Sequence, residues 1–561
     1  GFRAQMGTCV SKGKKERRSD SVSSPEAIPD RPTSANRDRG FRAQLVKHMS
    51  IGNIWDLYEV GDMLGSGMSG AVHVVRRKET GDTFAMKTVN MNRILPEALE
   101  DLRSEIQLLK EIDHPNVIKL YETYEDKRHM YLIMELCTGG ELYDRLVSQK
   151  YKRYTEKDAA NLVLQMCKAV AYIHGKNICH RDLKLENFVF ESEGKAAALK
   201  LIDFGLSRKY VQGLHMKSMV GTVYYIAPEV LKEQGYGLAC DIWAIGVITY
   251  ILLCGKPPFN GRENITILHK IAHGRFTFHH PVWKRVSDEA KDFIKFLLVP
   301  NPKRRPTIQE VLKHPWLAEG ARAPAVPLDE HIVESLHSFS KEKHLKRAAL
   351  EAIAFSLNPQ QIAELRDAFF AIDTDHSGTI SMEELEKALI KRGVPTDKVE
   401  AIFSTVDQDR TGVISYSEFL AASIRQRQFL TEERLMEAFE RLDTDGSGYI
   451  TAENLREVMG DDYDAARVEA MISEADIMGD GRISFDEFLK LMRDDVSHVR
   501  QELETAVAQA GVEMMERVIQ RDIADNPEVK LADQAVTTPF TTPRGPRSGS
   551  VGGATEEHKG D

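Results

Sequence analysis

Side chains that could carry phosphate chemistry gather in the sequence HRDLKLEN and in the DFG that begins sixteen residues after it. Acidic, cationic and amide side chains of the types used in proton transfer and metal binding lie close together here, as Asp182, Lys184, Asn187 and Asp203. Together these residues make phosphoryl transfer from a nucleotide a candidate chemistry.

A glycine-rich segment, GSGMSGAV, could hold the phosphates of that nucleotide, because glycine lets backbone N–H groups approach phosphate without an intervening Cβ. Lys87 lies where a cation could pair with phosphates, and Glu105 lies where a carboxylate could pair with Lys87. Alone, the glycine pattern also fits a turn and Lys87 an exposed strand end, so the HRDLKLEN motif decides the interpretation. The residues predicted to bind the nucleotide here are Gly65, Ser66, Gly67, Met68, Ser69, Gly70, Ala71, Val72 and Lys87.

The elements that must position these residues fall into two lobes. From Tyr58 to about Val89 short β-patterned segments alternate with turns, and helical periodicity follows, with brief apolar strands such as MYLIMEL and ALKLIDF. With an Ala-Pro-Glu at 227–229, the motifs stand in the order and spacing of one family, and residues 58–317 resemble the protein kinases. The resemblance implies an α+β, bilobal protein kinase fold.

Residue roles follow from this resemblance. The catalytic residues that it implies are Asp182 as the base, Lys184, Lys87 and Glu105. The residues that it adds to the ATP site are Glu135, Cys137 and Glu141, and the Mg²⁺ ligands are Asn187 and Asp203. It also pairs Glu229 with a buried arginine, Arg305. An inert protein with the same fold would be marked by loss of the lysine, the base or a metal ligand, and none of these is lost.

Substrate preference rests on fewer residues. The catalytic loop DLKLEN is of the serine/threonine type. Glu141 and Glu186 match positions where carboxylates of basophilic kinases face an arginine upstream of the target residue, although both also fit solvated surface acids or ribose ligands. We therefore expect protein substrates with basic residues near the target Ser or Thr.

Acidic loops recur from Asp373 onward at intervals of 34, 36 and 33 residues, between amphipathic helical segments. An EF-hand loop needs oxygen ligands at positions 1, 3, 5, 7, 9 and 12 and glycine at position 6. All four loops have that glycine and an apolar residue at position 8, which a plain acidic linker does not explain. The predicted Ca²⁺ ligands are Asp373, Asp375, Ser377, Thr379, Ser381, Glu384, Asp407, Asp409, Thr411, Val413, Ser415, Glu418, Asp443, Asp445, Ser447, Tyr449, Thr451, Asp476, Asp480, Arg482, Ser484 and Glu487.

Two of these loops depart from the pattern. Asn454 replaces the bidentate glutamate at position 12 of the third loop, and Met478 stands at position 3 of the fourth, where a side-chain oxygen is expected. We expect the third site to be weak or empty, and the fourth to bind with water in place of the absent ligand. The first two loops satisfy the pattern at every position, and we expect both to bind calcium.

A basic amphipathic segment joins the two units. In residues 331–357 lysine and arginine side chains stand beside an apolar face, as in helices that a calcium-opened EF-hand lobe grips, although a solvated linker helix is the alternative. Kinase motifs, junction and four EF-hands in this order resemble the calcium-dependent protein kinases of plants and protists. The resemblance implies that the junction inhibits the catalytic cleft until calcium makes the all-α EF-hand (calmodulin-like) domain take hold of it. Regulation by a separate calmodulin remains the other alternative, as does a calcium-binding interaction protein whose kinase fold is inert.

Composition narrows the class further. The net charge of −10 argues against nucleic-acid binding, and the 561 residues require several domains. Six cysteines without paired spacing and the absence of a signal peptide or a membrane-spanning run fit a cytoplasmic protein. The predicted units are 1–50 (disordered), 58–317 (kinase), 318–357 (inhibitory junction), 358–494 (four EF-hands) and 495–561 (a helix and a disordered tail).

The N-terminal segment carries a lipidation pattern. Met6-Gly7-Thr8-Cys9-Val10-Ser11 fits N-myristoylation of Gly7, and a palmitoyl group on Cys9 or the basic residues that follow would supply a second membrane signal. The pattern works only if Gly7 becomes the terminal residue, which needs translation to begin at Met6. Under that condition we expect peripheral membrane association.

Overall fold

The computed structural model describes residues 41–493, except for 68–69, 94–95, 206, 210–222, 233–236, 321–328, 360, 425–429 and 461–464. The predicted lipidation site at Gly7 and Cys9, the loop residues Met68 and Ser69, and the tail 495–561 lie outside the described residues. In the described part no helix is both long enough and apolar enough to cross a membrane.

The small lobe is built on one six-stranded sheet with the order β1-β5-β6-β4-β3-β2. All neighbours pair antiparallel except β1 and β5, which are parallel. Its strands are β1 (Lys47–Ser50), β2 (Tyr58–Gly67), β3 (Gly70–Arg77), β4 (Thr83–Asn90), β5 (Leu120–Glu125) and β6 (His129–Met134). Helix α2 (Pro96–Glu111) belongs to this lobe, as do the 3-10 turns η2 (Ile54–Asp56) and η3 (Met91–Arg93).

Residues 41–50 correct the prediction of a disordered segment 1–50. They form helix α1 (Phe41–Leu45) and strand β1, whose Lys47 stands opposite Glu122 of β5. Leu45 and Val46 are buried. The physical reason is that β5 would otherwise present a bare sheet edge, and the apolar pair Leu45-Val46 gains by burial against it.

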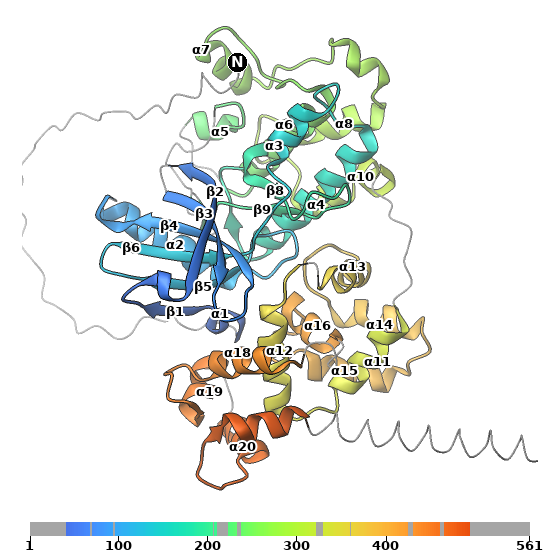
Figure 1. Ribbon diagram of the computed structural model, residues 1–561. Helices are drawn as coiled ribbons and strands as arrows, with labels where there is room; N and C mark the ends of the chain where they lie inside the picture. The colour runs from blue at the N-terminus through green and yellow to red at the C-terminus, as the bar shows by residue number, and fades with distance from the viewer. Residues whose placement is uncertain are drawn as a thin grey trace, which may run out of the picture.

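The large lobe is mainly helical and is drawn above the sheet of the small lobe in Figure 1. In the apolar helix α6 every residue from Cys240 to Cys254 is buried. The helices are α3 (Leu142–Ser148), α4 (Glu156–Gly175), α5 (Pro228–Leu231), α6 (Ala239–Cys254), α7 (Asn264–Ala272), α8 (Asp288–Leu297), α9 (Ile308–Leu312) and α10 (Pro315–Gly320). The short elements are β7 (Ile178–Cys179), η4 (Leu185–Asn187), β8 (Phe188–Phe190), β9 (Leu199–Leu201), β10 (Arg208–Lys209) and η5 (Pro281–Arg285).

Two junction helices and four EF-hands follow. The junction helices are α11 (Glu330–Phe339) and α12 (His344–Ser356). The EF-hand elements are α13 (Ala363–Ile372), α14 (Met382–Ile390), α15 (Thr396–Val406), α16 (Tyr416–Ser423), α18 (Glu432–Leu442), β11 (Tyr449–Ile450), α19 (Ala452–Met459), α20 (Ala465–Ala475) and β12 (Ile483–Ser484), with helical residues 485–493 completing the fourth hand. The loops pair through an Ile380–Ile414 bridge in the first pair of hands and through β11 and β12 in the second.

Helix α12 is the core of the EF-hand unit. It packs against α16 of the first pair and against α18 and α20 of the second, and it runs between them in Figure 1. Its residues from Leu345 to Phe355 are all buried, including Lys346 and Arg347, and Lys346 pairs with Glu342 at 3.0 Å. A helix buried along this whole stretch is not a solvated linker, so the linker alternative is wrong for this arrangement.

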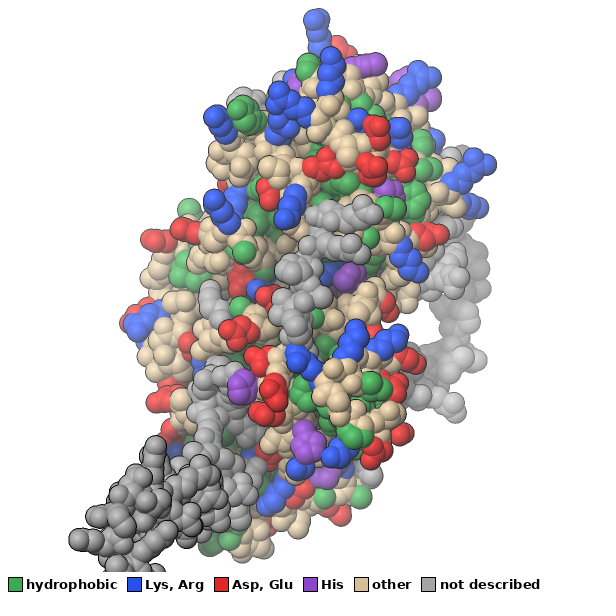
Figure 2. Space-filling view, turned by 90° about the vertical axis from the view of Figure 1, so that its right-hand side faces the viewer, with side chains coloured by type: hydrophobic (Ala, Val, Ile, Leu, Met, Phe, Trp, Pro, Cys, Tyr) green, Lys and Arg blue, Asp and Glu red, His purple; other side chains and the backbone are tan. Residues whose placement is uncertain are grey.

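The face of the molecule seen in Figure 2 carries acidic and basic side chains intermixed.

Candidate active site

One buried carboxylate fixes the backbone of the catalytic loop. Asp241, in the first turn of α6, accepts hydrogen bonds from the backbone N–H groups of His180 and Arg181, both at 2.9 Å, and lies 2.9 Å from Nε2 of His174. Burial would raise the pKa of Asp241, but the hydrogen bond and charge of His174 outweigh it and lower the pKa. Arg181 has φ 71°, a strained conformation that these bonds maintain.

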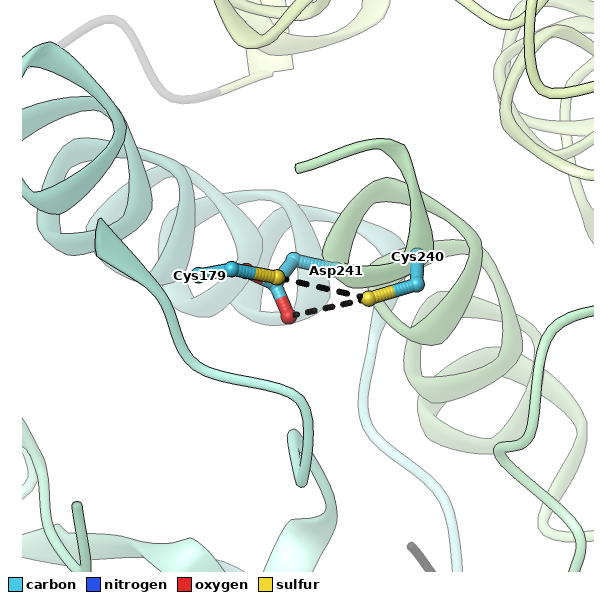
Figure 3. Close-up of side chains that lie close together, drawn as sticks. All are labelled: Cys179, Cys240 and Asp241. Atoms are coloured by element: carbon cyan, nitrogen blue, oxygen red, sulfur yellow. Dashed lines mark hydrogen bonds between the residues drawn. The ribbon is translucent and has the colours of Figure 1, made fainter. Parts of the chain in front are cut away.

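Two thiols lie beside this carboxylate. In Figure 3 the sulfur atoms of Cys179 and Cys240 face each other next to Asp241, and they are 3.5 Å apart. Burial raises the pKa of the Cys179 thiol well above its usual range. Both side chains pack as small apolar groups under the loop and form no disulfide.

The structure brings the predicted catalytic residues together above this support. Lys184 Nζ donates to Asp182 Oδ2, and Asn187 Nδ2 donates to the backbone oxygen of Asp182 at 2.8 Å. Because the amide nitrogen of Asn187 is committed to the loop, its oxygen is the atom left to face a cation. The 3-10 turn η4 carries Asn187 and fixes it relative to Asp182.

The second predicted metal ligand follows β9 and has an unusual backbone. Asp203 has φ 65°, and its carboxylate is exposed while the next residue, Phe204, is fully buried against the His180 ring. Lys87 Nζ lies 3.1 Å from Glu105 Oε1. Burial raises the pKa of Glu105, Lys87 lowers it, and the Asp203 charge raises it further, so the three groups lie in one electrostatic site.

Strands β2 and β3 form the glycine-rich hairpin over this site. Gly65 stands opposite Val72 and Ser66 opposite Ala71, and the described residues Gly65 and Ser66 are exposed. Gly70 has φ 129°, and a Cβ there would lie 2.0 Å from the Thr88 carbonyl oxygen, so only glycine fits.

The segment after β6 places the other predicted ATP residues. The Glu135 side chain is buried and pairs with Lys200 at 2.6 Å, so the Glu135 backbone is the part of this residue left for an adenine. Cys137 is half-buried, and Glu141 begins helix α3. Burial raises the pKa of Glu186, which is half-buried near the charges of Lys184 and Asp182.

Glu229 and Arg305 form the buried pair expected from the sequence. Arg305 donates to both oxygens of Glu229, at 2.7 and 2.9 Å, and also to the Ala239 carbonyl oxygen. A bidentate pair of this kind fixes the start of α5 relative to α6.

In the EF-hand unit the first two loops gather carboxylates. Two triplets each place ligand oxygens within 4.8 Å of one another, and they are Asp373, Asp375 and Glu384, and Asp407, Asp409 and Glu418. Burial raises the pKa of Asp373 to about 7 and that of Glu418 to about 8, with neighbouring carboxylates adding to both. Oxygen ligands at this spacing suit Ca²⁺.

The position-9 residues have a second role in these loops. Ser381 and Ser415 cap their exit helices and form capping boxes with Glu384 and Glu418. The position-7 carbonyl oxygens of Thr379 and of Val413 accept hydrogen bonds from the hydroxyl groups at position 5, Ser377 and Thr411, at 3.1 Å.

The third and fourth loops, both described in full, bring no such triplet together. In the third, Asp443 accepts hydrogen bonds from the Ser447 and Gly448 N–H groups, and Asn454 forms the capping box with Thr451. In the fourth, Glu487 accepts from the N–H groups of residues 477 and 478, while the Met478 side chain is 81% exposed and Arg482 lies over the Tyr449 ring.

Sequence reasoning missed the residues that join the two units. Ser417, at position 11 of the second calcium loop, donates through N–H and Oγ to Asp113 at 2.7 and 2.8 Å. Lys119 donates to the Phe355 carbonyl oxygen of α12 at 2.6 Å, and Arg366 of α13 donates to Glu191. These pairs lie 175 to 304 residues apart, and no local pattern announces them.

Glycine at position 6 of the first loop also serves this contact. Gly378 lies so close to the large lobe that a Cβ would be 2.6 Å from the His114 ring and 2.7 Å from that of Tyr172. The Lys168 ammonium group lies 4.0 Å from the centre of the Phe370 ring in the same contact. The first calcium loop therefore rests directly on the catalytic unit.

Comparisons with known proteins agree with this arrangement. The protein kinase domain model matches residues 58–317, and the EF-hand domain pair model matches 362–424 and 432–493. The chain is 39% identical to calcium-dependent protein kinase 17 of Arabidopsis thaliana over 86% of its own length and 92% of that protein. It is 38% identical to calcium-dependent protein kinase 34 of the same plant, over 84% and 91%, and to calcium-dependent protein kinase 20 of Oryza sativa subsp. japonica, over 81% and 83%.

Proposed function

Because this chain belongs to the calcium-dependent protein kinase family and is a calcium-activated serine/threonine kinase that uses ATP and Mg²⁺, we propose how its residues divide the work. Asp182 accepts or orients the substrate hydroxyl proton, and Lys184, bound to the same carboxylate, lies beside the transferring phosphate. Lys87, held by Glu105, takes the ATP phosphates together with the β2–β3 hairpin, through Gly65, Ser66, Gly67, Gly70, Ala71 and Val72. Met68 and Ser69, which lie between these strands in the sequence, complete the proposed phosphate-binding segment.

Asn187 and Asp203 would hold Mg²⁺, which when bound neutralises charge on the phosphate oxygens. Support comes from the Asn187 amide, whose nitrogen is bonded to the loop and whose oxygen is left for the metal. Replacing Asp182 with Asn should abolish transfer from radiolabelled ATP to a peptide. Full turnover in that variant would disprove the assignment.

Calcium control is proposed to act through α12. The first two loops, with their carboxylate triplets, are the sensors, and the grip of both EF-hand pairs on α12 is the single observation that supports this model. With α12 held between α16, α18 and α20, its C-terminal end contacts Lys119 and Tyr121 on β5 and the segment before it. In low calcium the junction 318–357 would instead inhibit the catalytic cleft.

The test is a radiolabel transfer assay on the full chain, in calcium or in chelator, without added calmodulin. We expect strong activity only in calcium. Equal activity in both conditions would overturn the regulatory model, and activity that required added calmodulin would show that the attached EF-hands are not the sensor.

Basic-directed specificity is proposed from Glu186, which lies in the catalytic loop, and Glu141, which forms a β-bridge with Val189 just after that loop; both are only partly buried. Replacing both with Gln should raise KM for a peptide with an upstream arginine and leave KM for its alanine analogue unchanged. An equal effect on the two peptides would refute this assignment.

Membrane attachment is proposed from Gly7 and Cys9, with the protein otherwise cytoplasmic. Intact-mass measurement of the native protein should show a myristoyl group on Gly7. A mass with residues before Gly7 still present would exclude this anchor.

A further inference from the structure

Arg441 of the third EF-hand is a cation buried where four segments of the chain meet. It is 2% exposed. Its guanidinium donates to the Leu45 carbonyl oxygen at 2.8 Å, to Glu437 at 3.0 Å, to Ser356 at 3.3 Å and to Glu122 at 3.4 Å. A buried guanidinium is tolerated only when its donors are satisfied, so α1, β5, α12 and α18 must all be in place together.

The two glutamates that accept hydrogen bonds from Arg441 also bind an arginine of the small lobe. Arg77 of β3 donates to Glu122 at 2.6 Å and to Glu437 at 3.3 Å, so two arginines and two glutamates form one closed set. Burial alone would raise the pKa of Glu122, but Arg77 and Arg441 outweigh it and lower the pKa to about 2. The hydroxyl of Tyr58 also donates to Glu122, at 2.7 Å.

Helix α1 connects this contact to the catalytic pair. It packs against α19 of the third hand and also against α2. Helix α2 carries Glu105, whose carboxylate lies 3.1 Å from Lys87 Nζ. The third hand therefore reaches the phosphate-binding lysine through two packed helices.

Hydrogen bonds among neutral side chains join the beginning of the third loop to its end. Asn454 Oδ1 accepts from the Thr451 N–H and Oγ1 groups, both at 2.9 Å, and Asn454 Nδ2 donates to Thr444 Oγ1 at 3.0 Å. Thr444 in turn donates to Glu457 at 2.7 Å. In the other three hands a glutamate at this position carries the charge that a calcium ion needs.

We propose that the third EF-hand docks the EF-hand unit onto the small lobe rather than sensing calcium, and that Arg441 is a positioning residue. Arg441 fastens the hand to the small lobe, and α1 passes that attachment to α2 and keeps Glu105 against Lys87. The inference rests on the proposed calcium-controlled grip on α12, because the hand reaches the small lobe only when the EF-hand unit holds that helix.

The test compares Arg441→Met with a matched control, Arg456→Met, in the full chain at saturating calcium. Arg456 lies in the same hand, is exposed, and pairs only with Glu453 on its own helix among the contacts described for it. We expect Arg441→Met to lower kcat/KM for ATP roughly tenfold and Arg456→Met to stay within twofold. The number of bound calcium ions should be unchanged in both. Arg441→Lys, which keeps the charge, should fall between.

A double-mutant cycle tests the route through Glu105. In a Glu105→Gln background, adding Arg441→Met should change the residual activity less than twofold, because the link it acts through is already cut. An undiminished tenfold loss there, or wild-type activity in Arg441→Met, would overturn the proposal. Loss of a bound calcium ion in Arg441→Met would overturn it too.

Hydrogen exchange separates a lost attachment from a lost fold. In Arg441→Met the amides of 41–50 should exchange faster while those of α6 stay protected. If α6 also loses protection in Arg441→Met, that variant has lost its fold, and the test passes to Arg441→Lys. A wild-type kcat/KM for ATP in Arg441→Lys would then overturn the proposed role of the Arg441 guanidinium. If the wild-type protein were equally active in calcium and in chelator, the calcium-controlled grip on α12, on which the proposal rests, would be rejected instead.

Discussion

The two pairs of EF-hands both touch the catalytic unit, but they do so with different parts. The first pair presents a calcium loop, with Gly378 against His114 and Tyr172. The second presents a helix, α18, with Arg441 against Glu122. The first pair gathers three carboxylates in each loop, and the second gathers no such triplet in its two loops. The carboxylate triplets for binding calcium are in the first pair, whereas the buried arginine that joins the EF-hand unit to the small lobe is in the second.

This difference has an electrostatic reason. Several carboxylates packed close together repel one another, and burial adds to the cost, so a loop built this way depends on a cation. The guanidinium of Arg441 already balances the acids that surround it. A loop that must respond to calcium and a contact that must hold are thus best built from different residues.

The most damaging change to this division should be removal of both sensor glutamates. Glu384→Gln with Glu418→Gln removes a charged bidentate ligand from each loop of the first pair. We expect the calcium concentration for half-maximal activity to rise by about two orders of magnitude. A calcium titration of peptide phosphorylation measures it. Glu487→Gln is the control from the second pair and should shift the curve much less. An equal shift in both variants would erase the distinction between the pairs.

Acidification should weaken the first pair selectively. Burial raises the pKa of Asp373 to about 7, with Glu384 adding to the effect, so calcium must displace a proton there at neutral pH. Affinity at that loop should be constant well above pH 7 and fall below it, by about tenfold between pH 8 and pH 6. Backbone hydrogen bonds from Ser484, Met478 and Ile477 lower the pKa of Glu487 to about 2, so this position-12 carboxylate of the fourth loop keeps its charge throughout.

Calorimetry in two buffers with different ionisation enthalpies would count the protons released. We expect release at pH 7 from the first pair. Absence of any release would contradict a raised pKa at Asp373.

Gly378→Ala compared with Gly412→Ala should isolate the contact between loop and kinase. Both glycines stand at position 6, with φ 81° and 83°, so alanine strains both loops alike by about 1 kcal/mol. The added Cβ meets open space at Gly412 but two rings at Gly378. Overpacking at the low end of its usual cost, ~1 kcal/mol, predicts roughly fivefold faster amide exchange at 113–117 in Gly378→Ala. Equal exchange in the two variants would show that the first loop does not rest there in solution.

The catalytic unit was largely predictable because its chemistry is local in sequence. The HRDLKLEN and DFG motifs place Asp182, Asn187 and Asp203 within 22 residues; Asn187 binds the Asp182 backbone, and Ile202, just before Asp203, donates to the Asn187 carbonyl oxygen. The Glu229–Arg305 pair was also predicted, through the family resemblance, and is present. The EF-hand repeat carried the same kind of local signal.

What could not be predicted was how the units meet. Arg441 and Leu45 are 396 residues apart, and nothing in either neighbourhood marks a partner. Residues 41–50 were included in the predicted disordered segment because residues 1–50 are rich in Ser, Pro, Arg and Lys and show little apolar periodicity. Residues 41–50 fold only because β5 offers an unpaired edge and the third hand covers α1. Such contacts depend on tertiary geometry rather than on periodicity.

The mildest change should come from restoring the absent glutamate of the third hand. Asn454→Glu supplies the carboxylate at position 12, so we expect one additional bound calcium ion by native mass spectrometry. The half-maximal calcium for activity should move less than twofold, because the first pair still sets the response and Arg441 still holds the hand to Glu122. A large shift in either direction would show that the third hand reports calcium to the kinase after all. No additional ion, with the half-maximal calcium unchanged, would mean that the hydrogen bonds of Thr444 and Thr451 keep the loop closed even to a complete ligand set.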